Sequence, residues 1–440
     1  PEGSYREIFQ NISKEISFKK LHRYSPKQVI KLNHSGMPDG ERECSICHRH
    51  DYLKDGETEC EICWTLKQMS GNILKGDFFT VTSKKEKTCL PLPGNCYLVT
   101  DTESTLRKRM KEDNYYIRSY SKNKPYSGYY VSTKLWVGDY VNGETFEELG
   151  QRATGIERIA VMRADVDNLG QAFVRGFENE KNGSKYVTLS RTATFSRKLS
   201  MFFKYHINSL LKEGGYSILE EEAQMEKEDD RRNALIVYSG GDDIFIVGAW
   251  DDIIGFAVDL HDNLMEYSQD TLKISAGIGI YPSKYPISIM ARETGRLEEA
   301  AKSVEGKNAV ALFDEKYTFP WEEFIENVVE EKLYFIQKYF KVVDEKGKNF
   351  LYNLLELVRK RKEDKINIAR FAYLLGRMEP KVQRGEKKEE IEEKRDLHRE
   401  FSRKMYEWIR VEKDAKELEM AIYLYVYTKR EKEEHDGVNE

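Results

Sequence analysis

Short apolar runs alternate with amphipathic stretches between residues 157 and 314, which predicts a mixed α/β unit. Runs of strand length cover 158–165, 234–239, 244–248, 272–280 and 309–313. Helical spacing of apolar residues predicts helices from about Leu169 and over 191–212, 251–268 and 287–303. This order, β-α-α-β-β-α-β-α-β, contains a ferredoxin-like βαββαβ core, so we expect an α+β fold.

The pattern of apolar and polar residues changes on both sides of this unit. Residues 64–150 hold short strand-like runs such as Phe78–Thr82 and Cys96–Thr100, whereas amphipathic helical patterns dominate after residue 318. The predicted organisation is a helix and basic extended linker (1–43), a cysteine module (44–63), a strand-rich connection (64–150), the α/β unit (151–317) and an all-α domain (318–440).

Composition narrows the functional classes. The 440 residues include 71 Lys and Arg against 76 Asp and Glu, a net charge of −5. Such a balance excludes a protein that binds nucleic acid through bulk charge alone. No run approaches the roughly 18 apolar residues of a membrane helix, and no signal-peptide pattern is present. The chain begins with Pro1 instead of Met, so we expect a segment to be missing upstream.

Four of the six cysteines form a C-x2-C-x12-C-x2-C pattern: Cys44, Cys47, Cys60 and Cys63. Two such knuckles offer four thiolates to one tetrahedral Zn²⁺, which predicts a structural zinc-ribbon module. The alternatives are disulfides or a redox pair, and a large chain with no sign of secretion disfavours disulfides. His48 and His50 lie beside the second cysteine and could replace one thiolate, but we expect them to face solvent.

Carboxylates occur at two strand ends. Asp165 and Asp167 close the first strand of the α/β unit, and Asp242 and Asp243 lie in the hairpin turn between the two central strands. We expect the first and third strands to lie side by side and parallel, with Asp165 and Asp243 close enough to share a metal ion. Oxygen ligands of this kind favour Mg²⁺ or Mn²⁺, which suits phosphoryl chemistry.

Each of these motifs by itself is weak evidence for a catalytic site. Gly-Gly-Asp-Asp is a common turn sequence, and a lone Asp-x-Asp is weaker evidence still. Their position at strand ends of one sheet makes them a candidate catalytic site. Gly240 and Gly241 would leave room for a nucleotide to approach the turn.

The α/β unit resembles the palm domain of nucleic-acid polymerases and nucleotide cyclases. More narrowly, the chain from about residue 20 onward resembles the large palm-bearing subunit of type III-A (Csm-type) CRISPR effector complexes. The resemblance is carried by Ala164–Gly170 (ADVDNLG), Gly240–Asp243 (GGDD), residues 196–203, 275–278 and 291–295, Glu298, and residues 301–302. The upstream zinc knuckles and downstream helices also match that family.

The resemblance implies that the palm binds ATP and joins it into cyclic oligoadenylates when the guide-RNA complex binds target RNA. It implies catalytic Mg²⁺ or Mn²⁺, a structural Zn²⁺, and partners that are the other effector subunits with guide and target RNA. Asp165 and Asp243 would be the firmest metal ligands, Asp242 the third carboxylate, and the carbonyl of Val166 a further ligand. Which of Asp242 and Asp243 lies closer to metal stays open, as does the role of Asp167.

Two further positions follow from the resemblance. Lys302, late in the helix before the last strand, stands where palm cyclases place a triphosphate-binding lysine, although a surface lysine is the alternative. Ser200 or Ser196, on the long helix, would face adenine.

The front of the chain departs from the family pattern. Full-length members usually begin with an HD-type nuclease domain and a first palm, and neither is visible, so we expect no DNase activity from this chain. The competing functions are a diguanylate-cyclase-like enzyme that uses GTP, and a non-catalytic palm scaffold that holds partner subunits. In each case the expected location is cytoplasmic.

Overall fold

The computed structural model describes all residues except 1–4, 35–41, 51–52, 54–55, 113, 125–132, 144, 179–180, 182, 184, 226–230, 344–348, 381–387 and 431–440. The chain divides into two compact units. Unit 1 comprises Pro1–Val137 with Gly170–Lys198, and unit 2 comprises Gly138–Leu169 with Leu199–Glu440. Among the described residues, no helix is both long and apolar enough to cross a bilayer.

Unit 1 begins with two helices, α1 (Tyr5–Leu21) and α2 (Pro26–His34). The predicted extended linker is therefore wrong over α2. Ser25 caps this helix, because its hydroxyl accepts the N–H of Gln28 at 3.4 Å and its own N–H donates to Oε1 of Gln28 at 2.9 Å. Pro26 occupies the first turn, where its missing N–H costs no hydrogen bond.

The second part of unit 1 is a five-stranded sheet with the order β2-β3-β1-β4-β5. Its strands are β1 (Phe78–Thr82), β2 (Leu90–Leu92), β3 (Cys96–Asp101), β4 (Tyr116–Lys122) and β5 (Thr133–Leu135). Two helices, α3 (Glu61–Lys75) and α4 (Glu103–Glu112), pack against it. The strands confirm the strand-rich character predicted for this region, but the sequence pattern did not indicate the two helices.

Unit 2 contains a six-stranded sheet with the order β11-β10-β9-β6-β8-β7. Its strands are β6 (Ile159–Val166), β7 (Ala234–Ser239), β8 (Asp243–Ala249), β9 (Ile274–Tyr281), β10 (Ala309–Leu312) and β11 (Thr318–Pro320). The four strands β9-β6-β8-β7 have the ferredoxin-like order, which confirms the predicted core.

The predicted direction of the third strand is wrong. β8 lies beside β6 as expected, but the two strands are antiparallel, and β9 is antiparallel to β6 on the other side. The cause is the hairpin between β7 and β8, which reverses the chain. Only this reversed direction brings the start of β8, at the hairpin turn, next to the end of β6.

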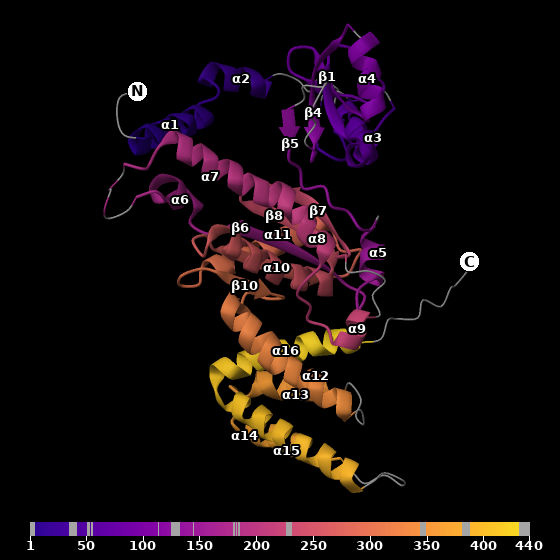
Figure 1. The fold of residues 1–440 in the computed structure, drawn as a ribbon, viewed down its shortest axis with the longest axis vertical. Helices are drawn as coiled ribbons and strands as arrows, with labels where there is room; N and C mark the ends of the chain where they lie inside the picture. The colour runs from indigo at the N-terminus through magenta and orange to yellow at the C-terminus, as the bar shows by residue number, and fades with distance from the viewer. Residues whose placement is uncertain are drawn as a thin grey trace, which may run out of the picture. The chain divides into compact units, whose positions relative to one another are not determined.

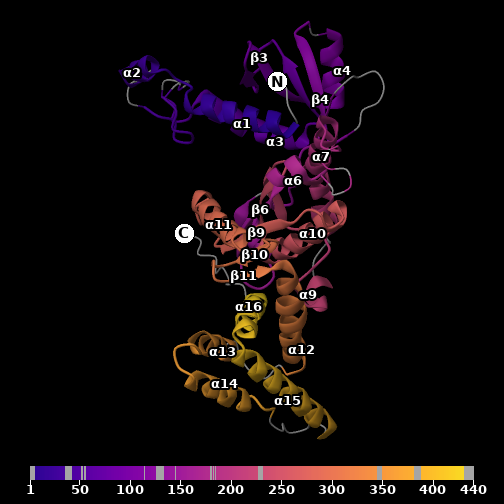
Figure 2. The ribbon, with the colours of Figure 1, turned by 90° about the vertical axis from the view of Figure 1, so that its left-hand side faces the viewer.

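Alternate residues of β6 face different helices. Ile159 and Val161 form an apolar cluster with Leu149 of α5 (Phe146–Gln151) and Met290 of α11 (Ile287–Lys302). A second long helix, α10 (Trp250–Ser268), also packs on β6, and Figure 2 shows α10 and α11 on opposite sides of the sheet. Because both faces are covered, β6 is buried along most of its length.

The long helix predicted over 191–212 is present but changes geometry along its length. It comprises α7 (Leu189–Met201), a π-helical segment η1 (Phe202–His206) and α8 (Ile207–Glu213). A shorter helix, α6 (Leu169–Arg175), begins where predicted, and α9 (Glu221–Met225) precedes β7.

The remaining helices of unit 2 gather beyond the β10–β11 edge of its sheet (Figure 1 and Figure 2). They are η2 (Glu323–Leu333), α12 (Tyr334–Val342), α13 (Asn349–Lys360), α14 (Ile366–Gly376), α15 (Lys388–Arg410) and α16 (Glu412–Lys429). The buried ammonium of Lys332 lies 2.6 Å from Oε2 of Glu417 and ties η2 to α16.

The helices and the sheet of unit 2 are joined by specific contacts. The indole N–H of Trp321 donates to the carbonyl of Ile274 in β9 at 2.9 Å. The N–H of Ile156, just before β6, donates to the carbonyl of Tyr427 near the end of α16 at 2.9 Å. A Cβ atom at Gly155 would lie only 2.1 Å from that same carbonyl oxygen, so glycine allows this close approach.

Candidate functional site

The predicted carboxylates meet at one end of the unit 2 sheet. Asp165 ends β6, Asp243 begins β8, and the two are direct partners in the antiparallel register. The carbonyl of Asp242 accepts the N–H of Val166 at 3.1 Å, which fixes the hairpin turn to the end of β6. Three carboxylates and the Val166 backbone are thus held within one small region by strand pairing.

The charges at this strand end repel one another. Partial burial raises the pKa of Asp242, the nearby carboxylates of Asp165 and Asp243 raise it further, and only Lys302 opposes them. Each carboxylate in this cluster makes ionisation of Asp242 less favourable, and a divalent cation bound among their oxygens would offset this repulsion. The donor set therefore fits Mg²⁺ or Mn²⁺.

Lys302 reaches this cluster from the last turn of α11. Its ammonium lies 2.7 Å from Oδ2 of Asp165 and 2.6 Å from Oε1 of Glu298. Burial alone would lower the pKa of Lys302, but its hydrogen bonds to the two carboxylates raise it. The side chain of Lys302 is therefore paired with two carboxylates on the wall of a cavity and is not an isolated surface lysine, whereas its binding of triphosphate stays a prediction.

A cavity of about 360 Å³ opens beside the carboxylates. It is lined by Arg163, Ala164, Asp165, Tyr238, Asp243, Ile244, Phe245, Glu298 and Lys302. The sequence predicted no role for Arg163, Tyr238 or Glu298. Signals existed: Arg163 is two residues from Asp165 on one strand, and Glu298 is four residues from Lys302 on one helix.

The two glycines of the turn have different surroundings. A Cβ atom at Gly240 would lie 2.4 Å from Oδ1 of Asp243 and 2.6 Å from the hydroxyl of Tyr238, so a side chain there would displace the carboxylate. A Cβ atom at Gly241 would lie 3.6 Å from Oγ of Ser200, which places Ser200 beside the turn. Gly240 thus lies against the carboxylate of Asp243, and Ser200 lies beside Gly241, whereas the nucleotide-binding roles of these residues stay predictions.

Asp167 has a different role from Asp165. Its side chain is buried and accepts the hydroxyl of Ser275 at 2.9 Å and the backbone N–H of Asn308 at 2.9 Å. These bonds tie the end of β6 to β9 and to the loop after α11. The structure therefore gives Asp167 an anchoring role, which the sequence left open.

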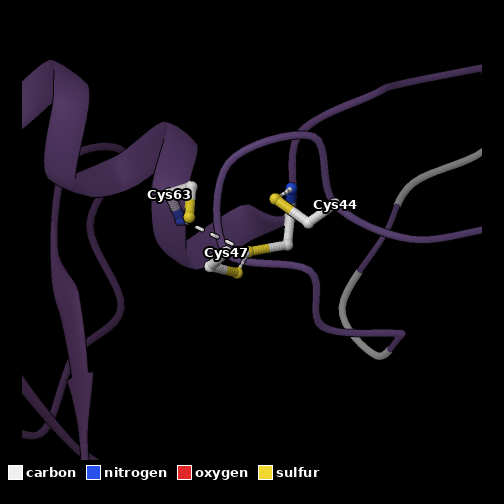
Figure 3. Close-up of side chains that lie close together, drawn as sticks. Cys44, Cys47 and Cys63 are labelled. Atoms are coloured by element: carbon white, nitrogen blue, oxygen red, sulfur yellow. Dashed lines mark hydrogen bonds between the residues drawn. The ribbon is translucent and has the colours of Figure 1, made fainter. Parts of the chain in front are cut away.

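The second predicted site lies in unit 1 (Figure 3). The sulfur atoms of Cys44, Cys47, Cys60 and Cys63 all lie within 4.8 Å of one another. The N–H of Cys60 donates to the sulfur of Cys44 at 3.3 Å, and the N–H of Cys63 donates to the sulfur of Cys60 at 3.4 Å. Four converging sulfurs with backbone donors around them fit a tetrahedral Zn²⁺.

The cysteine pKa values support this fit. Backbone N–H donors from Cys47 and Cys60 lower the pKa of Cys44 to about 6, whereas hydrogen bonding to Cys47 raises the pKa of Cys63 to about 12. Four thiolates cannot share this space without a cation. The histidines point elsewhere: Nδ1 of His48 pairs with Glu43 at 3.2 Å, and Nδ1 of His50 lies 3.0 Å from the carbonyl of Arg42.

Comparison with known families matches both parts of unit 2. Residues 158–311 match the family model for the second palm domain of Cas10/Cmr2. Residues 337–431 match the model for the second helical domain of the Cmr2 subunit of the CRISPR RNA silencing complex. The palm and the helices that the sequence predicted therefore correspond to two adjacent domains of one known subunit type.

Curated relatives match nearly the whole chain. The chain is 42% identical over 438 residues to the CRISPR system single-strand-specific deoxyribonuclease Cas10/Csm1 (subtype III-A) of Mycobacterium tuberculosis, covering 98% of this chain and 52% of the relative. The Streptococcus thermophilus protein of the same name is 39% identical over 437 residues, covering 96% of this chain and 52% of the relative. The chain thus spans about half the length of these relatives.

Solved structures share the fold. Csm1 of T. onnurineus superposes with a TM-score of 0.57 at 25% identity, over 82% of this chain and 50% of that one. An apo Csm1–Csm4 cassette gives a TM-score of 0.58 at 24% identity, over 83% and 50% of the two chains. A Csm1–Csm4 cassette in complex with cA4 gives 0.56 at 22% identity, over 81% and 49%.

Proposed function

The chain belongs to the Cas10/Csm1 family of subtype III-A CRISPR systems, and we propose that its palm converts ATP into cyclic oligoadenylates by metal-dependent nucleotidyl transfer. One observation carries the proposal. Asp165, Asp242 and Asp243 converge at a strand end, beside Lys302 and an open cavity. Carboxylates next to a cation in a cavity are what binding of a metal–triphosphate requires.

Each carboxylate has an assigned task. Asp165 and Asp243 would hold Mg²⁺ or Mn²⁺ together, with Asp242 as the third carboxylate and the carbonyl of Val166 as a further ligand. Such ions lower the pKa of an attacking hydroxyl and stabilise charge on departing pyrophosphate. The antiparallel pairing of β6 and β8 sets the spacing of these oxygens before any ligand binds.

The nucleotide would lie along the turn. Lys302 pairs with the triphosphate, Gly241 leaves space for the ribose of the nucleotide, and Ser200 lies next to the adenine. Gly240 instead leaves room for the carboxylate of Asp243. In this structure Lys302 pairs with Asp165 and Glu298. Binding therefore exchanges one anionic partner of this lysine for another.

We further propose that the chain acts inside a type III-A effector complex with its other subunits, guide RNA and target RNA, in the cytoplasm. Structures with this fold have been solved as Csm1–Csm4 cassettes, including one with cA4. The net charge of −5 fits a subunit whose RNA is held mainly by partners. The four cysteines would hold one structural Zn²⁺.

The test is to incubate the chain with ATP and Mg²⁺ or Mn²⁺, with and without partner subunits and target RNA, and to identify products by mass. Cyclic oligoadenylates that disappear in the double variant Asp242→Ala, Asp243→Ala support the proposal. Equal turnover of GTP in competition would instead favour a diguanylate-cyclase-like enzyme. No ATP turnover by the assembled complex would favour a scaffold.

A further inference from the structure

Two side chains of β6 pair with two side chains of α11. Arg163 and Asp165 are two residues apart on the strand, so both leave the same face of the sheet. Glu298 and Lys302 are four residues apart on the helix, so they are neighbours on one helix face. Nε of Arg163 lies 3.1 Å from Oε2 of Glu298, and Lys302 binds Oε1. One buried carboxylate therefore joins two cations.

The backbone of α11 makes room for this arginine. A Cβ atom at Gly295 would lie 2.8 Å from Nη1 of Arg163, so a larger residue would push the guanidinium away. The same Nη1 donates to the carbonyl of Ala291 at 3.4 Å. Although Arg163 is held at these points, 40% of its side chain is exposed, and it lines the cavity that Asp165 and Lys302 also line. A ligand in that cavity can reach the guanidinium.

The charges favour an anionic ligand once a metal ion is bound. The cations Arg163 and Lys302 pair with two carboxylates, Glu298 and Asp165, so the charges on this wall of the cavity are balanced. When Asp165 coordinates a divalent cation, its charge no longer balances Lys302. Two cations then face one carboxylate, and this wall of the cavity becomes attractive to phosphate.

We propose that Arg163 is a second phosphate-binding cation, which contacts the triphosphate of the nucleotide together with Lys302, while Glu298 holds both cations in place. This inference rests on the proposed function and adds a residue to it. A guanidinium can bond two phosphate oxygens at once, which a lysine cannot do. The pair would therefore orient the phosphate chain as well as attract it.

Equilibrium binding tests the inference without turnover. The full chain is titrated calorimetrically in Mg²⁺ with adenosine and with an ATP analogue whose α–β bridge is a methylene group, which binds but cannot transfer its nucleotide. We expect Arg163→Gln to lower the affinity for the analogue by about tenfold or more and the affinity for adenosine by less than about twofold. Arg296→Gln is the matched control, because Arg296 is an exposed arginine of α11 that lines a different cavity.

Other outcomes overturn the inference or its premise. If Arg163→Gln lowers the affinity for both ligands equally, or for neither, the inference is wrong and the arginine only positions α11 against β6. If Lys302→Ala lowers the affinity for the analogue and Arg163→Gln does not, only the inference about Arg163 is wrong. If the parent chain binds neither ligand, the proposed function fails with it. If the glutamine variant does not fold, Arg163→Lys replaces it in the test, because lysine keeps the positive charge but cannot bond two phosphate oxygens at once. If Arg163→Lys binds both ligands with the affinity of the parent chain, the proposed two-oxygen contact is wrong.

Discussion

Asp165 and Asp243 are direct cross-strand partners in the antiparallel pair of β6 and β8. Their side chains leave adjacent backbones on the same face, so neither can move away from the other without breaking the strand pairing. Two carboxylates held together in this way repel each other unless a cation lies between or beside them. The proposed metal site is thus a consequence of strand register.

Removing either of these two proposed metal ligands should abolish the proposed catalysis without unfolding the protein. We expect Asp165→Asn or Asp243→Asn to lower cyclic oligoadenylate synthesis by at least about 100-fold, because each removes a charged metal ligand. The measurement is product mass in the assembled complex at saturating Mg²⁺. Asp396→Asn, at an exposed aspartate of α15, is the control and should retain parent activity. Near-parent activity of both site variants would contradict the assignment.

Asp242 should destabilise the metal-free protein at neutral pH. Its pKa is raised by burial and by Asp165 and Asp243, so the folded state disfavours its ionised form and loses stability as pH rises through that raised pKa. Asp242→Asn should therefore raise the melting temperature in EDTA at neutral pH, by up to about 2 °C, and this gain should shrink in acid. A gain that grows in acid would show that the sign is wrong.

Asp167 should matter for stability more than for metal binding. Replacing it with alanine leaves the buried hydroxyl of Ser275 and the N–H of Asn308 without their acceptor. Each unsatisfied group should lower the free energy of unfolding by about 1–3 kcal/mol. We expect Asp167→Ala to lower the melting temperature by about 3–8 °C and to speed hydrogen exchange at 303–308. Ser275→Ala, which removes one donor, should cost less. An unchanged melting temperature for Asp167→Ala would refute the anchoring role.

The cysteine cluster should contain about one zinc per chain, measured by elemental analysis of protein purified without chelator. Because four thiolates need a cation to stay together, Cys44→Ser or strong chelators should loosen residues 44–75. Hydrogen exchange should show this loss in unit 1 and little change in β6. Cys96→Ser, at a cysteine outside the cluster, is the control. Exchange in residues 44–75 that is unaffected by chelation would exclude a structural metal.

The central palm strands β6, β8, β9 and β10 could be predicted because they are mostly buried and therefore appear as nearly continuous apolar runs. The direction of β8 could not be read from such runs, since pairing is set by the hairpin and not by composition. Helix α4 was missed because Leu106 is its one fully buried side chain among those described, which leaves no helical period to detect. Helix α2 had a usable signal, the Ser25 capping box followed by Pro26.

The candidate site shows the same division. Asp165, Asp242 and Asp243 belong to short strings at strand ends, which a sequence displays directly. Arg163 and Glu298 form a contact between elements far apart in the chain, and only the three-dimensional packing of α11 on β6 reveals it. Local spacing showed that each shared a face with a predicted site residue, but not that the two faces meet.

The contacts of Trp321 with Ile274 and of Ile156 with Tyr427 have a practical consequence for dissecting the protein. A fragment ending at residue 317 would lose edge strand β11, the indole beneath β9 and the helix that closes over the start of β6. The palm and the terminal helices should therefore melt in one cooperative transition. The sheet that carries the proposed site is thus held by residues far along the sequence, and deletion of those residues should abolish the proposed activity as completely as changes to Asp165, Asp242 or Asp243.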